Sequence, residues 1–292
     1  MSGVPVNETS AGKRFSYAKF IFMSRFLFSL LLTTFLCTCV LAQNNPPASY
    51  TPRSQAAVLG LQDAQVLDQM MFYIPGIGSA SREDLLRQNI KSYMMPIRQV
   101  PDLNMEWAYA LTGALEYYLN LNNNFKDNLS PDYISLNLAA LGRRPTVEDG
   151  LRFLVQNGTV SAAIVPYGSP TIPPAVYSVP RHDITNFGYL FRPETRPRNR
   201  VFEVRKALSR GNPVVVELKT DPGFVNLRGG EYKPAANTTE THYLTVVGYD
   251  GEAEMFELRG SFGRLWADAG YVRLSYDDFG TLAQNGFVLI PK

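Results

Sequence analysis

The pattern of apolar and polar residues divides the chain into a helical first half and a β-rich second half. Apolar residues recur at three- and four-residue spacing over residues 107–118, which predicts a largely buried helix with Glu106 at its N-terminus. Backbone N–H groups converge at such an end and favour an anion or a polarised nucleophile. Further helical patterns cover residues 61–71, 81–89 and 201–209.

Two more helices are predicted from the residues at their ends. Ser130 followed by Pro131 is typical of an N-cap residue and a first helical position. Residues 146–158 form a helical pattern that ends in a glycine, a common C-terminal signal. From about residue 185 onwards, alternating apolar positions and segments broken by glycine predict an antiparallel, barrel-like sheet.

The N-terminus has the features of a secretory signal peptide. Residues 23–42 contain a basic residue, an apolar stretch and a small residue, Ala42, before Gln43. We therefore expect residues 1–42 to be a signal peptide, with Met23 as an alternative start, and the protein to be exported, either secreted or periplasmic. Cleavage would leave no stable membrane anchor; the alternative is that this segment remains as an N-terminal membrane anchor.

The polar, proline-rich residues 43–60 read as a linker. We therefore assign residues 43–90 to a linker and N-terminal extension, and residues 91–292 to the main domain.

The composition of the chain limits the partners and the kinds of catalysis that are open to it. The 292 residues are 45% hydrophobic and 18% charged, as in globular proteins, and the net charge of +2 gives no basis for a nucleic-acid partner. The only two cysteines, Cys37 and Cys39, lie in the predicted signal peptide, so the exported chain would have no thiolate and no disulfide.

His182 stands alone in a proline-rich loop and is expected to be solvent-exposed. We expect no metal site and no cofactor.

Several motifs resemble the papain-like cysteine peptidase family. Residues 96–110 resemble the family's Pro-Val-x-x-Gln-Gly-x-Cys-Gly-Ser-Cys-Trp-Ala-Phe segment. Residues 241–249 resemble its Asp-His-Ala-Val-x-x-Val-Gly-Tyr strand, and residues 258–274 follow its Lys-Asn-Ser-Trp-Gly-x-x-Trp-Gly run without gaps. The resemblance covers about residues 90–292. It implies an α+β, two-lobed papain-like fold, with a helical lobe at about 96–165, an antiparallel β-barrel-like lobe at about 185–292, and the site in the cleft between them.

The resemblance also places the catalytic positions. His242 matches the catalytic histidine, Glu106 stands at the nucleophilic cysteine, Val100 at the oxyanion-hole glutamine and Gly260 at the asparagine that orients the histidine. Because three of these four parts are altered, we expect no thiol-type proteolysis. An ion pair between Glu106 and His242, which would mimic the family's thiolate–imidazolium pair and leave His242 more protonated than in solution, is a further hypothesis.

Three functions remain open from the sequence. The favoured hypothesis is a secreted, catalytically inactive homologue that binds a peptide or protein ligand in the interlobe cleft, as a binding or scaffolding module. The second is a hydrolase in which Glu106 and His242 act through water as an acid/base pair. The third is an active cysteine peptidase. The N-terminal extension is either a remnant of the family's inhibitory pro-segment or a plain extension.

Overall fold

The computed structural model describes residues 59–78, 86–121, 123 and 126–292. The predicted signal peptide and most of the predicted linker lie outside these residues. The chain divides into two units, Met1–Ala57 and Val58–Lys292, and every element described below belongs to the second. Within the described residues, no helix has both the length and the apolar character needed to cross a membrane.

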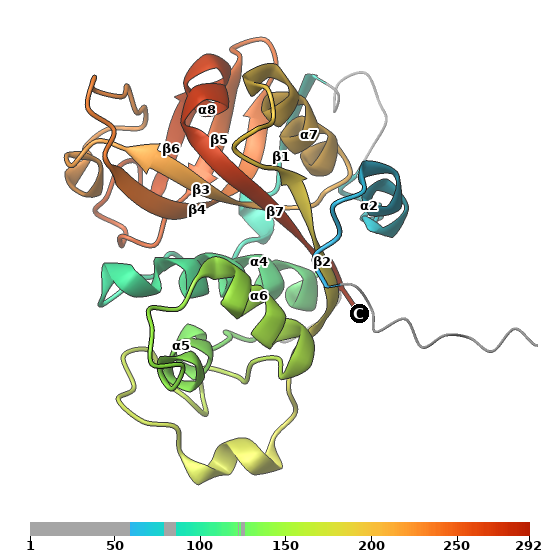
Figure 1. Ribbon diagram of the computed structural model, residues 1–292, viewed down its shortest axis with the longest axis vertical. Coiled ribbons are helices and arrows are strands. Elements are labelled where there is room, and N and C mark those ends of the chain that lie inside the picture. The colour runs from blue at the N-terminus through green and yellow to red at the C-terminus, as the bar shows by residue number, and fades with distance from the viewer. Residues whose placement is uncertain (1–58, 79–85, 122, 124–125) are drawn as a thin grey trace, which may run out of the picture. The chain divides into compact units, whose positions relative to one another are not determined.

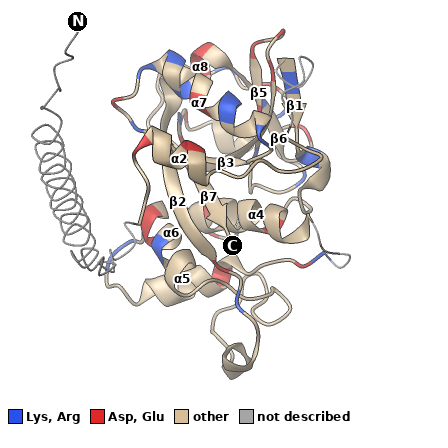
Figure 2. Cartoon of the chain, turned by 90° about the vertical axis from the view of Figure 1, so that its right-hand side faces the viewer, with Lys and Arg blue, Asp and Glu red and all other residues tan. Residues whose placement is uncertain are grey.

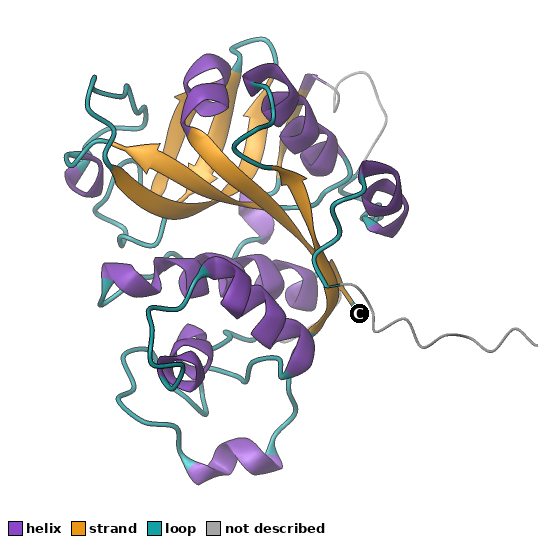
Figure 3. Ribbon diagram, in the orientation of Figure 1, coloured by secondary structure: helices purple, strands orange, loops and turns teal. Residues whose placement is uncertain are grey.

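Three α-helices and their connecting loops form one layer, which we call the helical lobe (Figures 1 and 3). They are α4 (Glu106–Asn120), α5 (Pro131–Ala139) and α6 (Val147–Gln156). The predicted end signals are present. The Ser130 side chain accepts from the Tyr133 N–H with Pro131 at the first helical position, and Thr146 and Asp149 form a capping box at the start of α6.

Seven strands form one antiparallel sheet, in the order β2-β7-β3-β4-β5-β6 with β1 also paired to β4. The strands are β1 (Arg87–Asn89), β2 (Ile184–Phe191), β3 (Val214–Thr220), β4 (Glu240–Asp250), β5 (Met255–Arg259), β6 (Tyr271–Ser275) and β7 (Ala283–Pro291). The sheet is antiparallel, as predicted, but it is open rather than closed into a barrel. Together, sheet and helices make an α+β fold of two lobes.

Both faces of this sheet are buried. On one face, Val215 belongs to a cluster with Leu111 of α4, whereas its neighbours Val214 and Val216 pack on the other face. That other face is covered by α7 (Pro197–Ser209) and α8 (Tyr276–Leu282), as Figure 1 shows. Successive side chains of a strand point to opposite faces, so the uninterrupted apolar run of β3 is that of a strand covered on both sides.

Two local predictions are wrong. Residues 87–89 were expected to be helical, but they form β1, which pairs with residues 248–250 of β4; residues 81–85 lie outside the described part of the chain. A short helix, α8, was missed in the β-rich half. Its N-cap is Ser275, whose side chain accepts from the Asp278 N–H. Pairing with β4 determines the structure of residues 87–89, and the Ser275 cap marks the start of α8; apolar periodicity indicated neither.

Residues 59–78 of the N-terminal extension lie along β2 and α7. Leu61 forms a parallel bridge with Gly188 of β2. In α2 (Ala64–Met70), Asp68 forms an ion pair with Lys206 of α7, with 2.9 Å between Nζ and Oδ1. The carbonyl of Phe72 accepts from Asn212, whose amide oxygen accepts from Tyr118 near the end of α4.

Asn212 thus links this segment to α4 at Tyr118, twelve residues after Glu106 and about 18 Å away along the helix axis at 1.5 Å per residue. Charged residues of both signs are interspersed over the described elements (Figure 2).

Candidate functional site

The side chains of Glu106 and His242 meet where the first turn of α4 faces strand β4. Nδ1 of His242 lies 2.9 Å from each carboxylate oxygen of Glu106. A carboxylate only accepts hydrogen bonds, so this contact requires a proton on Nδ1. Both residues are almost fully buried, with 1% of Glu106 and 5% of His242 exposed. The contact that the hypothesised ion pair requires is therefore present, and the pair is ionic only when His242 is protonated.

Local structure fixes where the Glu106 carboxylate lies. The preceding 3-10 turn, η2 (Leu103–Met105), begins at Asp102, whose side chain accepts from the Asn104 N–H at 2.9 Å. Trp107 Nε1 then donates to the carbonyl of Asn104 at 2.9 Å. These bonds hold the chain as it enters α4, so that its first residue points at β4. At this end the helix dipole favours a negative charge, which offsets part of the cost of burial.

The backbone N–H of Tyr243 is a second donor to Glu106, at 3.3 Å from Oε2. Sequence reasoning did not assign Tyr243 to the site. Its ring packs against the cluster beneath α4, and burial raises its pKa to about 12, with Glu217 adding to the effect. An N–H donor of the main chain leaves no mark in a sequence, so only the fold could reveal this contact.

Aromatic rings enclose the imidazole of His242. Phe224 stacks on it, with 5.4 Å between ring centroids and 25° between planes. Phe262 meets it edge to face, at 5.4 Å and 83°. Trp266 Nε1 donates to the Phe224 carbonyl at 2.7 Å and so anchors the stacking ring. Trp266 belongs to the core, and the partly buried Phe262 packs against it; Phe262 also forms part of the wall around His242.

Val100 and Gly260 offer the site no side-chain donor. Val100 is buried, and its N–H donates to the carbonyl of Ser261 at 2.7 Å, which joins the segment before α4 to the loop after β5. A Cβ on Gly260 would lie 2.7 Å from the ring of Trp266 and 2.9 Å from that of Phe262. The rings fill the space that a larger side chain at this position would need.

A buried ion pair, which sequence reasoning missed, holds this segment against α4. Arg98 Nη2 lies 2.8 Å from Oε1 of Glu116, and 12% and 0% of the two side chains are exposed. Burial raises the pKa of Glu116, while the guanidinium of Arg98 opposes that shift. Glu116 also accepts from the Leu129 N–H. Glu116 lies on the helix face opposite the predicted apolar stripe, so apolar periodicity did not mark it as buried.

His182 lies apart from these groups. It was expected to be solvent-exposed, but it is half-buried because its backbone exchanges two hydrogen bonds with Thr159, of 2.7 and 2.8 Å. In the part of the chain that the structure describes, no group of three or more His, Cys, Asp or Glu side chains is placed to hold a metal ion.

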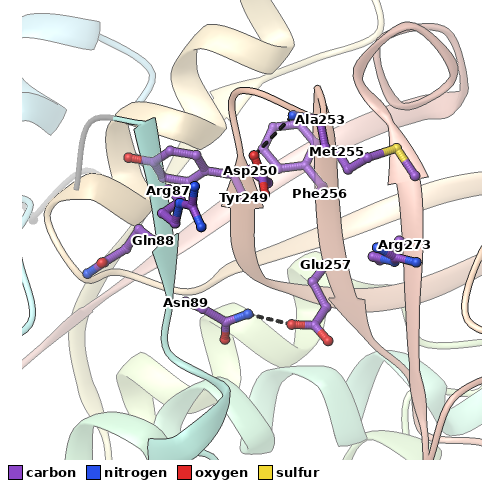
Figure 4. A pocket seen from close by; sticks show the side chains of 10 residues that line it. All are labelled: Arg87, Gln88, Asn89, Tyr249, Asp250, Ala253, Met255, Phe256, Glu257 and Arg273. Atoms are coloured by element: carbon purple, nitrogen blue, oxygen red, sulfur yellow. Dashed lines mark hydrogen bonds between the residues drawn. The ribbon is translucent and has the colours of Figure 1, made fainter. Parts of the chain in front are cut away.

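One hollow of about 410 Å³ lies on the sheet, away from Glu106 and His242 (Figure 4). Its charges are largely matched. Glu257 pairs with Lys91 at 2.8 Å and accepts from Asn89, and Arg87 pairs with Glu252 at 3.0 Å. We assign it no chemistry.

The arrangement at α4 and β4 therefore consists of a carboxylate and an imidazole in direct contact inside an aromatic shell. The pair can share a proton. It contains no thiol or hydroxyl, and the residues at Val100 and Gly260 add no side-chain donor for a developing oxyanion.

Comparison with known proteins assigns the family. The family model described as papain family cysteine protease matches residues 87–285, which is more than half of the chain. The chain belongs to the papain family of cysteine proteases. Both elements of the candidate site, α4 and β4, lie within the matched residues.

The curated relatives that the chain matches are distant in sequence. The gamete and mating-type specific protein A of Dictyostelium discoideum is 27% identical over 205 residues, which cover 67% of this chain and 44% of that protein. Stem bromelain of Ananas comosus is 24% identical over 187 residues, 63% of this chain and 84% of bromelain. The chain thus spans less than half the length of the first of these relatives and most of the second.

Solved structures of the family share the fold. The Carica candamarcensis cysteine protease CMS1MS2, solved in complex with E-64, superimposes with a TM-score of 0.58 at 16% identity, covering 71% of this chain and 99% of that one. Xylellain, a cysteine protease from Xylella fastidiosa, gives 0.56 at 18% identity, covering 80% and 96%. At these identities the likeness establishes the papain-like fold alone.

Proposed function

We propose that this protein is a catalytically inactive member of the papain family that binds an extended peptide or protein segment between its two lobes. The observation that carries the proposal is the contact of Glu106 with Nδ1 of His242, 2.9 Å from both oxygens. By the resemblance of residues 96–110 to the family, Glu106 stands where the nucleophilic cysteine would be. The Glu106 carboxylate therefore contacts the ring nitrogen of His242 that a thiolate at this position would face.

The chemistry of a carboxylate supports inactivity. Attack of Glu106 on a peptide carbonyl would form an anhydride, a poor intermediate for peptide hydrolysis. Removal of the predicted signal peptide, with Cys37 and Cys39, would leave no cysteine to take over as nucleophile. The direct contact with His242 also leaves no water between the two groups, as the alternative acid/base hydrolase would require. Binding of a peptide and its cleavage are separable, so the lobes can retain the first without the second.

Export is part of the proposal. The basic residue, the apolar stretch and Ala42 before Gln43 support a cleaved signal peptide. We expect protein recovered from outside the producing cell to begin at Gln43, which N-terminal sequencing measures. Protein that retains residues 1–42 and stays with the membrane would contradict export.

The decisive experiment measures cleavage and binding on the same preparation. Exported protein is incubated with a fluorogenic peptide library, and binding of the same peptides is followed by fluorescence anisotropy. We expect binding, and no turnover above that of a Glu106→Gln, His242→Ala double variant. Turnover that disappears in each single variant would establish the acid/base hydrolase instead. Turnover that thiol alkylation abolishes would establish a cysteine peptidase.

A further inference from the structure

A hollow of about 370 Å³ opens in the helical lobe beside the start of α4. It is lined by Met105 and Trp107, the sequence neighbours of Glu106, but by neither Glu106 nor His242. Its volume falls in the range of about 300–1,000 Å³ that is typical of small-ligand sites. The hollow is therefore separate from the Glu106–His242 contact but adjacent to the residues that carry it.

Most of its wall is apolar. The apolar lining residues come from the segment before α4, from α4 and α5, and from the loop before α6: Pro101, Met105, Trp107, Leu136, Ala139 and Pro145. Such a wall suits an aliphatic or aromatic body rather than a small hydrated ion.

The charged groups of the lining are two carboxylates, Asp102 and Asp132, and one guanidinium, Arg144. They differ in their exposure. Asp102 and Arg144 are exposed, so solvent screens them. Asp132 is 2% exposed and stands in the first turn of α5. The net charge of the lining is thus negative, and its one desolvated charge is a carboxylate.

Asp132 lacks a cation. Among the described residues, none of the Lys, Arg or His side chains forms an ion pair with it. Its donors are the hydroxyl of Tyr109, at 3.3 Å from Oδ2, and backbone N–H groups, among them that of Gly168. Burial raises the pKa of Asp132, which is the direction expected of an anion without a neighbouring positive charge. A carboxylate has about four acceptor positions, so it retains room for a donor from the hollow.

We propose that this hollow receives the lysine or arginine side chain of a bound peptide, with the cationic group paired to Asp132 and the aliphatic stem against the apolar wall. Long cationic side chains combine an apolar stem with a charged end, which is the combination that the lining offers. The inference rests on the proposed peptide-binding function and names the side chain that such a peptide would carry. The helix-capping role of α5 does not require Asp132, because Ser130 already caps that helix.

The test compares three small probes on the full exported chain: the N-acetyl amides of lysine, arginine and norleucine. Norleucine has the apolar stem of lysine without the ammonium group. Tryptophan fluorescence or calorimetry follows binding, since Trp107 lines the hollow. We expect lysine and arginine amides to bind about tenfold or more tightly than norleucine amide, the size of a charge-assisted hydrogen bond at a desolvated site.

Variants separate the buried charge from the exposed one. Asp132→Asn should abolish the cation preference, whereas Asp102→Asn, at an exposed lining residue, should change it less than about twofold. Ala139→Trp fills the hollow from an exposed position on α5, so it should block all three probes even if Asp132→Asn folds poorly. Thermal unfolding of each variant establishes that it is folded.

The outcomes distinguish this inference from the proposed function. Peptides that bind without preference for lysine or arginine, together with probes that do not bind, would overturn the cation site and leave peptide binding intact. Cationic probes that bind through Asp132, in a protein that binds no peptide, would support the cation site and overturn the peptide-binding function. Equal binding of lysine and norleucine amides would also overturn the inference, because the charge would then contribute nothing.

Discussion

Replacing His242 by leucine should destabilise the fold strongly, because it leaves a buried carboxylate without its partner. Glu106 is 1% exposed, and both of its oxygens lie 2.9 Å from Nδ1 of His242. In His242→Leu its remaining donor from β4 is the Tyr243 N–H, at 3.3 Å. Removal of the partner of a buried charge costs about 3–5 kcal/mol. For a domain of this size, that corresponds to a fall in Tm on the order of 10 °C.

The double variant isolates the cause. Glu106→Leu combined with His242→Leu removes both polar side chains and should recover most of the lost stability, because hydrophobic replacement of a buried pair is often neutral. Urea unfolding at pH 7, followed by tryptophan fluorescence, measures the free energy of unfolding for the cycle. The matched control is Arg87→Met, which breaks an ion pair whose side chains are 58% and 62% exposed and should cost about 0–1 kcal/mol. A cost below about 1 kcal/mol for His242→Leu would refute the reasoning.

Three further outcomes are expected. Gly260→Asn should lower stability by about 1–3 kcal/mol, since its Cβ would meet the ring of Trp266 at 2.7 Å; calorimetry measures the change in Tm. Ser130→Ala should cost about 1 kcal/mol in urea unfolding through loss of the α5 N-cap. Asp149→Asn should cost about 0.5–2 kcal/mol at pH 7 through loss of the α6 capping box. Hydrogen bonds from Arg143 hold the pKa of Asp149 below its ordinary value of 3.8, so its contribution is present above that pH and lost as the pH falls.

Controls for these outcomes are available in the same chain. Gly142→Asn places the same side chain in open space at a positive φ that asparagine tolerates, so it should change Tm little. If both glycine variants behave alike, crowding by the two rings is not the cause. For Asp149→Asn, the difference from wild type should shrink between pH 7 and pH 3. A difference that grows with acidity would contradict the assigned direction of the pKa.

Features governed by short-range signals were predictable from the sequence. The apolar stripe of α4, the N-cap at Ser130 and the C-terminal glycine at Gly158 each depend on residues a few positions apart. The strand character of residues 87–89 depends on pairing with residues 248–250. Nothing within the segment itself indicates that partner, so its helical pattern was misleading.

The candidate site also has features that the sequence predicted and features that it did not. The contact of Glu106 with His242 was hypothesised from the resemblance, because the family's motifs match positions that are far apart in the sequence but adjacent in the fold. The stacking of Phe224 on His242 was not predicted. Nor was the buried partner of Arg98, Glu116. Both depend on the side-chain packing of this particular chain, and motif spacing does not encode packing.

The placement of the N-terminal extension bears on how this protein can be controlled. Residues 59–78 pair with β2 and α7, and hydrogen bonds through Asn212 link Phe72 to Tyr118 near the end of α4. A protease that trimmed this segment would expose the apolar surfaces of Leu67 and Gly188, which now pack together. The hydrogen-bond partners of Glu106, His242 and Tyr243, lie outside the segment. For residues 59–78, trimming would therefore weaken the scaffold rather than release a zymogen.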